Sequence, residues 1–146
     1  MEQAAIDNRG VSGTIARDVE PVRPGVFPPE VQLVISALEA GPRPVVDRHK
    51  LPRVVHRTVA ELKLFSDAPG AEPHTLYTRH VNPKAVGFVV DRPLPLSHGG
   101  VVVLRSLDGR RLLRIFCTVL RCRPVTERWY EGAVYFNRPQ EQFAAE

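Results

Sequence analysis

Alternation of apolar and polar residues is the feature that most limits what this chain can fold into. Ala60, Leu62 and Leu64 occupy every second position of one such run, with Glu61 and Lys63 between them. Successive side chains of a β-strand point to opposite faces, so a period of two predicts a strand that buries one face. The chain is therefore predicted to be mainly β.

Six segments carry strand patterns and are joined by short turns. They span residues 59–64, 76–81, 87–91, 101–107, 111–123 and 129–137. The strongest turn signal is Asp108-Gly109, because glycine accepts the positive φ that a tight hairpin requires. Closing such a sheet on itself removes exposed strand edges. We predict an all-β fold, a small six-stranded antiparallel β-barrel that is closed or partly open.

One short helix is expected before the barrel. Two prolines and an acidic residue stand where a helix start favours them, and apolar residues follow at helical spacing. We expect this helix from about Pro29 to Ala40, where Gly41-Pro42 ends it. The last segment, 138–146, forms either a second short helix that packs Phe143 onto the barrel or a frayed end.

A chain of 146 residues suits one domain with tails. Residues 1–27 mix charge, glycine and proline without apolar periodicity, so we expect a flexible N-terminal arm there. Residues 28–47 are expected to hold the short helix and a basic, proline-rich linker, and residues 48–146 the barrel domain.

The formal net charge of +4 favours an anionic partner. It is too small for a dedicated nucleic-acid binder, so no DNA or RNA partner is expected. No apolar run approaches the ~20 residues of a membrane span, and no signal-peptide core is present. Cys117 and Cys122 would point to opposite faces of a regular strand, so we expect free thiols. We predict a cytoplasmic protein without a membrane partner.

The sequence contains none of the common catalytic or nucleotide-binding motifs. No G-x-S-x-G, Walker or G-x-G-x-x-G pattern is present, and the five histidines are scattered without metal-binding spacing. We therefore expect no enzyme, no metal site and no cofactor.

Two motifs suit a phosphorylated ligand. The first is the arginine pair Arg53-Val-Val-His-Arg57, whose guanidiniums present rigid forks of donors that fit phosphate oxygens and guanine edges. The second is Asn82-Pro-Lys-Ala-Val-Gly87, where Asn82 offers an amide to a base edge and Gly87 leaves the backbone open to close approach. The alternative interpretation of the first motif is a solvated basic linker, and that of the second is a plain β-turn.

The arrangement resembles the PilZ domain, over roughly Arg48 to Phe143. In that family an R-x-x-x-R motif precedes the first barrel strand, and a D/N-x-S-x-x-G motif lies in a turn between strands. The two motifs together bind cyclic di-GMP. Asn82 and Gly87 match the ends of the second motif, and Lys84 occupies its serine position.

The register of the first motif is open. Arg53 and Arg57 have the family's spacing. The family's second arginine, however, usually precedes the valine or isoleucine that opens the strand, which favours Arg53-Val54 as that position. The first position would then fall on His49 or, with one extra residue, on Arg48. The closing segment Trp129-Tyr-Glu-Gly-Ala-Val-Tyr-Phe136 adds to the resemblance.

The resemblance implies a receptor for cyclic di-GMP whose basic linker orders around the ligand and which signals to a protein partner. The implied ligand-binding residues are Arg48, Arg53, Arg57, Asn82, Lys84 and Gly87. Lys84 motivates an alternative, a degenerate PilZ adaptor that binds no nucleotide and acts through protein contacts, because an ammonium cannot replace a hydroxyl that donates and accepts. A third interpretation, a small barrel that binds RNA or single-stranded DNA, requires aromatics exposed on a strand face, and the pattern places few there.

Overall fold

The computed structural model describes residues 27–40 and 52–145. In chain order its elements are α1 (Pro29–Ala40), β2 (Val54–Val55), β3 (Val59–Leu64), β4 (His74–Val81), β5 (Ala85–Val90), β6 (Gly99–Arg105), β7 (Leu112–Pro124), β8 (Tyr130–Phe136) and the 3₁₀ turn η1 (Glu141–Phe143). The predicted basic linker, which follows the helix up to residue 47, and the predicted arm apart from Phe27 lie outside the described residues.

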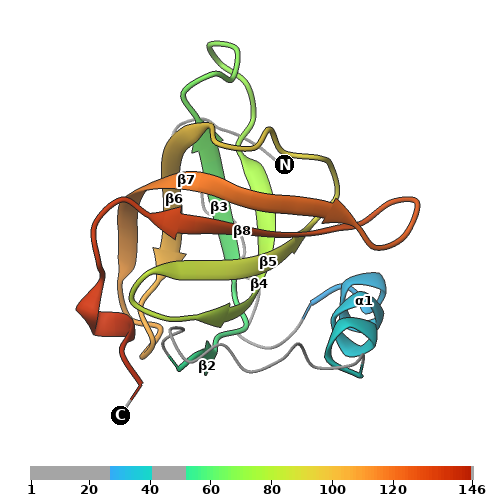
Figure 1. Cartoon of the computed structure of the whole chain (residues 1–146), viewed down its shortest axis with the longest axis horizontal. Coiled ribbons are helices and arrows are strands. Elements are labelled where there is room, and N and C mark those ends of the chain that lie inside the picture. Colours follow the sequence, from blue (N-terminus) through green and yellow to red (C-terminus); the bar gives the residue numbers. More distant parts are fainter. Residues whose placement is uncertain (1–26, 41–51, 146) are drawn as a thin grey trace, which may run out of the picture.

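Six antiparallel strands close into a barrel (Figure 1). Their order is β4-β3-β6-β7-β8-β5, and β5 pairs back onto β4, while the short β2 pairs with the end of β4 on the edge that β3 occupies further along. The predicted all-β barrel is confirmed, and each predicted strand begins and ends within two residues of an observed one. Alternation and turn chemistry were sufficient to predict the strands because both signals are local, although neither expresses the pairing of β3 with β6 or of β5 with β8.

Large apolar side chains from every barrel strand fill the interior. Fully buried examples are Leu62, Leu76, Phe88, Leu104, Cys117 and Val134. At one end Phe143 of η1 is also fully buried and stacks on Phe136, with ring centroids 5.9 Å apart. Of the two alternatives for the C-terminal segment, packing of Phe143 is therefore correct, through a single 3₁₀ turn rather than an α-helix.

Two β-bulges break the alternation. On β4 the register shifts between Thr78 and His80, so that Arg79 and His80 both belong to the outer surface. On β7 a matching shift at Leu120 turns Cys122 toward the core, on the same side as Cys117. The expectation that the two thiols face opposite ways is wrong for this reason, although both are free.

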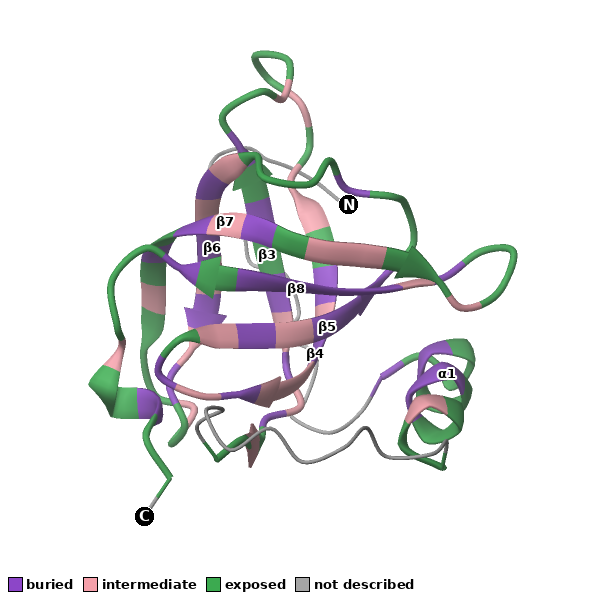
Figure 2. Ribbon diagram, in the orientation of Figure 1, coloured by how far each residue is buried: buried purple, intermediate pink, exposed green. Residues whose placement is uncertain are grey.

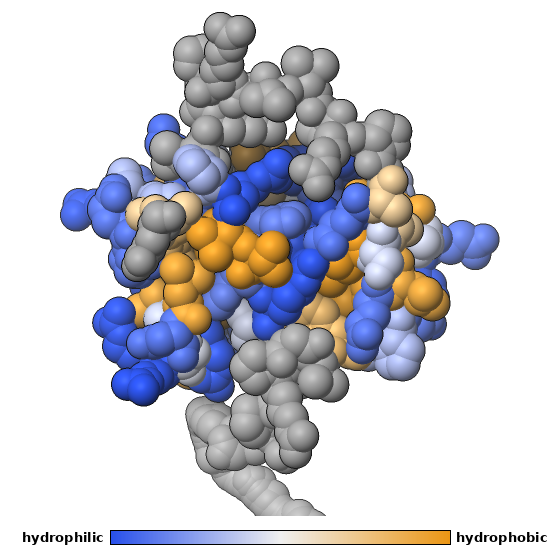
Figure 3. Space-filling view, turned by 90° about the horizontal axis from the view of Figure 1, so that it is seen from below, coloured by the Kyte–Doolittle hydropathy of each residue, from blue (hydrophilic) through white to orange (hydrophobic). Residues whose placement is uncertain are grey.

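The helix α1 lies beside the barrel next to β5 (Figure 1). Its buried residues Val31, Val34 and Ile35 form a second apolar cluster with Val89 and Trp129 of the barrel. This packing buries Val89 on the outer side of β5, and Figure 2 shows β8 purple over most of its length. Viewed from the lower end of the barrel, hydrophilic side chains run between separate apolar patches (Figure 3).

Candidate functional site

A row of outward-facing residues crosses four neighbouring strands. His80 on β4 pairs with Gly87 on β5, Gly87 with Ala133 on β8, and Ala133 with Arg121 on β7. A Cβ added to Gly87 would lie 3.8 Å from the carbonyl oxygen of Gly132, which is an ordinary contact. Packing among the described residues therefore does not require glycine at this position. The lack of a side chain at Gly87 leaves an open floor on the barrel surface between His80 and Arg121.

A buried carboxylate orders three arginines beside this floor. Glu131 on β8 is 1% exposed and accepts hydrogen bonds from Arg121 Nη2 at 2.5 Å and Arg123 Nε at 3.0 Å. Arg79 Nη1 lies 3.5 Å from Glu131 Oε2. Burial raises the pKa of Glu131, but the hydrogen bond and charge of Arg121 and the charges of the other two arginines outweigh it and lower that pKa. The carboxylate is therefore ionised at neutral pH and holds the guanidiniums in place.

A second ion pair links this surface to α1. Arg57 Nη2 donates to Glu39 Oε2 at 2.5 Å, and His80 Nε2 lies 3.7 Å from the same oxygen. Burial raises the pKa of Glu39, but the hydrogen bond and charge of Arg57 outweigh it and lower that pKa. The pKa of His80 is lowered, first by burial and then by the charges of Arg79 and Arg53. His80 is therefore neutral at pH 7.

Two buried guanidinium nitrogens, Arg57 Nη1 and Arg79 Nε, have no acceptor among the described residues. An unsatisfied buried donor costs about 1–3 kcal/mol. An anion that reaches these atoms would remove that cost. The surrounding surface, here called the arginine face, consists of Arg53, Arg57, Arg79, His80, Gly87, Arg121, Arg123, Glu131, Ala133 and, from α1, Glu39. Its five arginines outnumber its two carboxylates, which favours a negatively charged ligand.

Asn82 stabilises the turn between β4 and β5. Its Oδ1 accepts from the backbone nitrogens of Lys84 at 2.8 Å and Ala85 at 3.0 Å. The turn interpretation of this motif therefore holds, and the side-chain oxygen is fully used. The side-chain nitrogen makes no hydrogen bond within the described part of the chain. Lys84 is exposed on the turn, beyond the arginine face.

The structure brings part of the predicted site together. Arg57 and Gly87 belong to the arginine face. Arg53 is exposed immediately before β2, close enough for its charge to lower the pKa of His80. Arg48 lies outside the described residues.

Sequence reasoning missed Glu39, Arg79, Arg121, Arg123 and Glu131. The two arginines of β7 occupy alternate positions around a cysteine, so the period of two could have placed them together on the outer face. The pairing of Glu131 with them depends on the register between β7 and β8. The period of two also places Arg79 on the outer face with Tyr77, whereas no local signal reveals the bulge that turns His80 outward.

Comparison with known proteins identified no relative: no family model, no curated protein and no solved structure matches the chain. Within residues 27–40 and 52–145, no group of three or more His, Cys, Asp or Glu side chains could hold a metal ion. No helix described by the structure has the length and apolar character needed to cross a membrane.

Proposed function

We propose that the protein is a cytoplasmic receptor for cyclic di-GMP, built on a PilZ-type barrel, rather than an enzyme. The observation that carries the proposal is the arginine face, where Arg57 and Arg79 have donors without an acceptor among the described residues, beside the open floor at Gly87. Cyclic di-GMP presents phosphates and guanines, so its site needs charge-assisted donors for oxygens and flat or forked groups for bases. The order of the two motifs along the chain adds support through the family resemblance.

Each part of the ligand has a matching group in this proposal. Arg57 Nη1 and Arg79 Nε, which have no acceptor in the part of the chain that the structure describes, donate to phosphate oxygens. A guanine lies over Gly87, where no side chain obstructs it, with the guanidinium of Arg121 available for stacking.

Glu39 connects the ligand to the surface that a partner meets. A phosphate on Arg57 competes with the Glu39 carboxylate, which pairs with the same guanidinium. Glu39 is in the last turn of α1, where the helix dipole disfavours an acidic residue, so its contact is readily exchanged. Ligand binding would then free the end of α1 while the apolar cluster keeps the helix on the barrel.

We expect isothermal titration calorimetry of the purified protein with cyclic di-GMP to give a dissociation constant in the micromolar range or below. Arg57→Ala should weaken binding about tenfold or more, since it removes a charge-assisted hydrogen bond. Arg110→Ala, an exposed arginine on the β6–β7 turn, is the matched control and should bind as the wild type does. Equal affinities for all three proteins would exclude Arg57 from the site, and GMP tested alongside shows whether the cyclic dinucleotide is needed.

Glu39→Gln should strengthen cyclic di-GMP binding up to about fivefold, because an exposed ion pair that competes with the ligand is worth about 0.2–1 kcal/mol. Glu30→Gln removes the other exposed glutamate pair of α1, with Arg128, and should leave the affinity unchanged. The same titrations measure both. An unchanged affinity for Glu39→Gln would show that the ligand does not displace this carboxylate.

A second candidate function is the degenerate adaptor that binds no nucleotide. It is favoured by the turn itself, where the Asn82 oxygen serves the backbone and Lys84 replaces the family's serine. Titrations that are flat for both the wild type and Lys84→Ser, together with a partner that co-purifies, would support it.

One observation favours the nucleic-acid interpretation: the aromatic residues Phe65, Phe116 and Tyr135 are exposed. Binding of a single-stranded oligonucleotide that weakens steeply with salt would support that interpretation.

A further inference from the structure

The first residues of β7 extend beyond the end of β8, the strand that pairs with one of its two edges. Its pairing with β6 begins at Leu112, whereas its pairing with β8 begins only at Cys117. Beyond that point the bond from Asn137 N to Phe116 O, at 2.9 Å, continues the ladder by one step. Residues 112–115 of β7 therefore have a neighbouring strand on one side only among the described residues.

The register shows which backbone groups are left on this open edge. Ser106 N donates to Arg111 O, which places the hydrogen-bonding groups of the odd-numbered residues of this stretch toward β6. The N–H and C=O groups of Leu112 and Arg114 then point away from β6. Continuing the β8 ladder would bring Pro139 opposite Arg114, and proline has no N–H to donate, which explains why the chain leaves β7 here.

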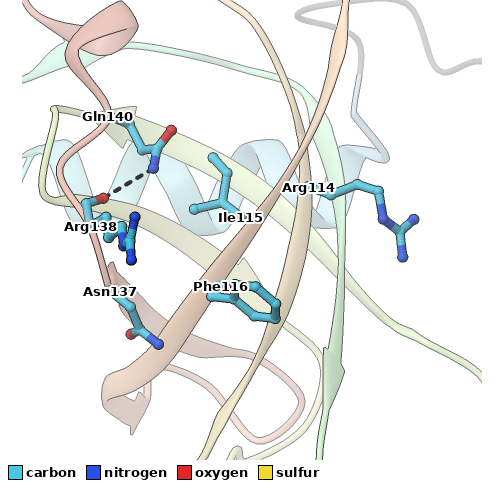
Figure 4. A pocket seen from close by; sticks show the side chains of 6 residues that line it. All are labelled: Arg114, Ile115, Phe116, Asn137, Arg138 and Gln140. Atoms are coloured by element: carbon cyan, nitrogen blue, oxygen red, sulfur yellow. Dashed lines mark hydrogen bonds between the residues drawn. The ribbon is translucent and has the colours of Figure 1, made fainter.

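A cavity lies along the same edge. It has a volume of about 350 Å3, lies between the start of β7 and the segment after β8, and is lined by Arg114, Ile115, Phe116, Asn137, Arg138 and Gln140 (Figure 4). Ile115 is buried, so an apolar side chain that enters the cavity meets an apolar wall. The opposite wall is tied by a hydrogen bond from Gln140 Nε2 to Arg138 O.

The charges around the cavity are mostly positive. Arg110, Arg111, Arg114 and Arg138 are all exposed and have no ion-pair partner within residues 27–40 and 52–145. The nearby Asp108 accepts hydrogen bonds from Ser106 and from the turn backbone. A binding partner for this edge should therefore be acidic.

We propose that the β7 edge, defined by residues 112–115 and this cavity, binds an extended acidic segment of a partner protein as an added β-strand. Alternate residues of the segment would be apolar and enter the cavity, and the residues between them would carry carboxylates toward Arg114 and Arg138. A second copy of this chain is a poorer occupant, because edge-to-edge pairing of two β7 strands brings the same arginines together. The proposal is independent of the nucleotide.

The test uses a fluorescein-labelled seven-residue peptide of alternating glutamate and valine, titrated with the full-length protein by fluorescence anisotropy. A copy methylated at the backbone nitrogens of its glutamates keeps every side chain and lacks the pairing donors. We expect the plain peptide to bind and the methylated copy to bind at least about tenfold more weakly. Amide hydrogen exchange at Leu112 and Arg114 should slow when the plain peptide is added.

Two variants at position 114 separate the contribution of the backbone hydrogen bond to peptide binding from that of the side-chain charge. Arg114→Ala keeps the backbone donor and loses the charge, so we expect about threefold weaker binding. Arg114→Pro also loses the N–H, which points away from β6, and should remove binding. Equal affinity for the methylated peptide, unchanged exchange at the two amides, or no binding up to about 1 mM peptide would each overturn the proposal. So would a concentration-dependent dimer that Arg114→Pro abolishes.

Discussion

Glu131→Ala should lower the free energy of unfolding by about 3 kcal/mol, since removing one partner of a buried ion pair leaves the others uncompensated. We expect a loss at the lower end of the range for such changes, because the more exposed arginines remain solvated when the carboxylate is removed. The side chain of Arg79 is 12% exposed, that of Arg121 40% and that of Arg123 68%. Urea denaturation followed by circular dichroism measures the loss.

Two further variants sharpen this prediction. Glu61→Ala changes an exposed glutamate on β3 and should alter stability by less than about 0.5 kcal/mol. Glu131→Gln keeps the shape and loses the charge. Because the pKa of Glu131 is lowered in the folded state, its contribution is present above the unfolded value of 4.5 and is lost as the pH falls through the folded value. The stability of Glu131→Gln should therefore depend less on pH in the acidic range, and a loss below about 1 kcal/mol for Glu131→Ala would contradict this account of the cluster.

Gly100→Ala should destabilise the barrel by about 3 kcal/mol, at the upper end for overpacking. A Cβ at Gly100 would lie 2.3 Å from the carbonyl oxygen of Lys63 and 2.9 Å from Cα of Leu64. Both are backbone atoms of β3, which pairs with β6 through Leu64 and Gly100. Neither can move without separating the two strands, and the same denaturation experiment measures the cost.

Gly87→Ala is the matched control for that substitution. Its Cβ would make an ordinary contact at 3.8 Å, so the change in stability should stay within about 1 kcal/mol. If Gly100→Ala were as stable as Gly87→Ala, the close approach of β3 and β6 would not be the reason for glycine at position 100.

The barrel could be predicted from the sequence because its signals are local. Each strand carries its own alternation, and the hairpin at Asp108-Gly109 joins two strands that are consecutive in the chain. The order of strands around the barrel, with β5 between β4 and β8, depends on long-range pairing that no local pattern expresses. The strand patterns and short turns predicted the barrel, and the structure supplied the strand order and register.

The candidate site was predictable only in part, for the same reason. Arg57 and Gly87 stand out in the sequence as an arginine of a spaced pair and a glycine within a strand. Alternation alone places Arg79 on the outer face with Tyr77, but only the pairing of the strands shows that it meets Glu131, and the bulge after Thr78 adds His80 to the same face. The meeting of Glu131 with the arginines of β7 follows from the offset created by a second bulge, at Leu120. Bulges therefore decide the composition of this surface, and they are the features that periodicity cannot reveal.

The floor at Gly87 also offers a genetic tool. Since a Cβ at position 87 would make only an ordinary contact within the described packing, alanine can be installed there without unfolding the barrel. If the proposed site is correct, Gly87→Ala and larger substitutions would weaken cyclic di-GMP binding in graded steps. In living cells such an allelic series would then separate phenotypes that require the ligand-bound protein from those that require only its presence.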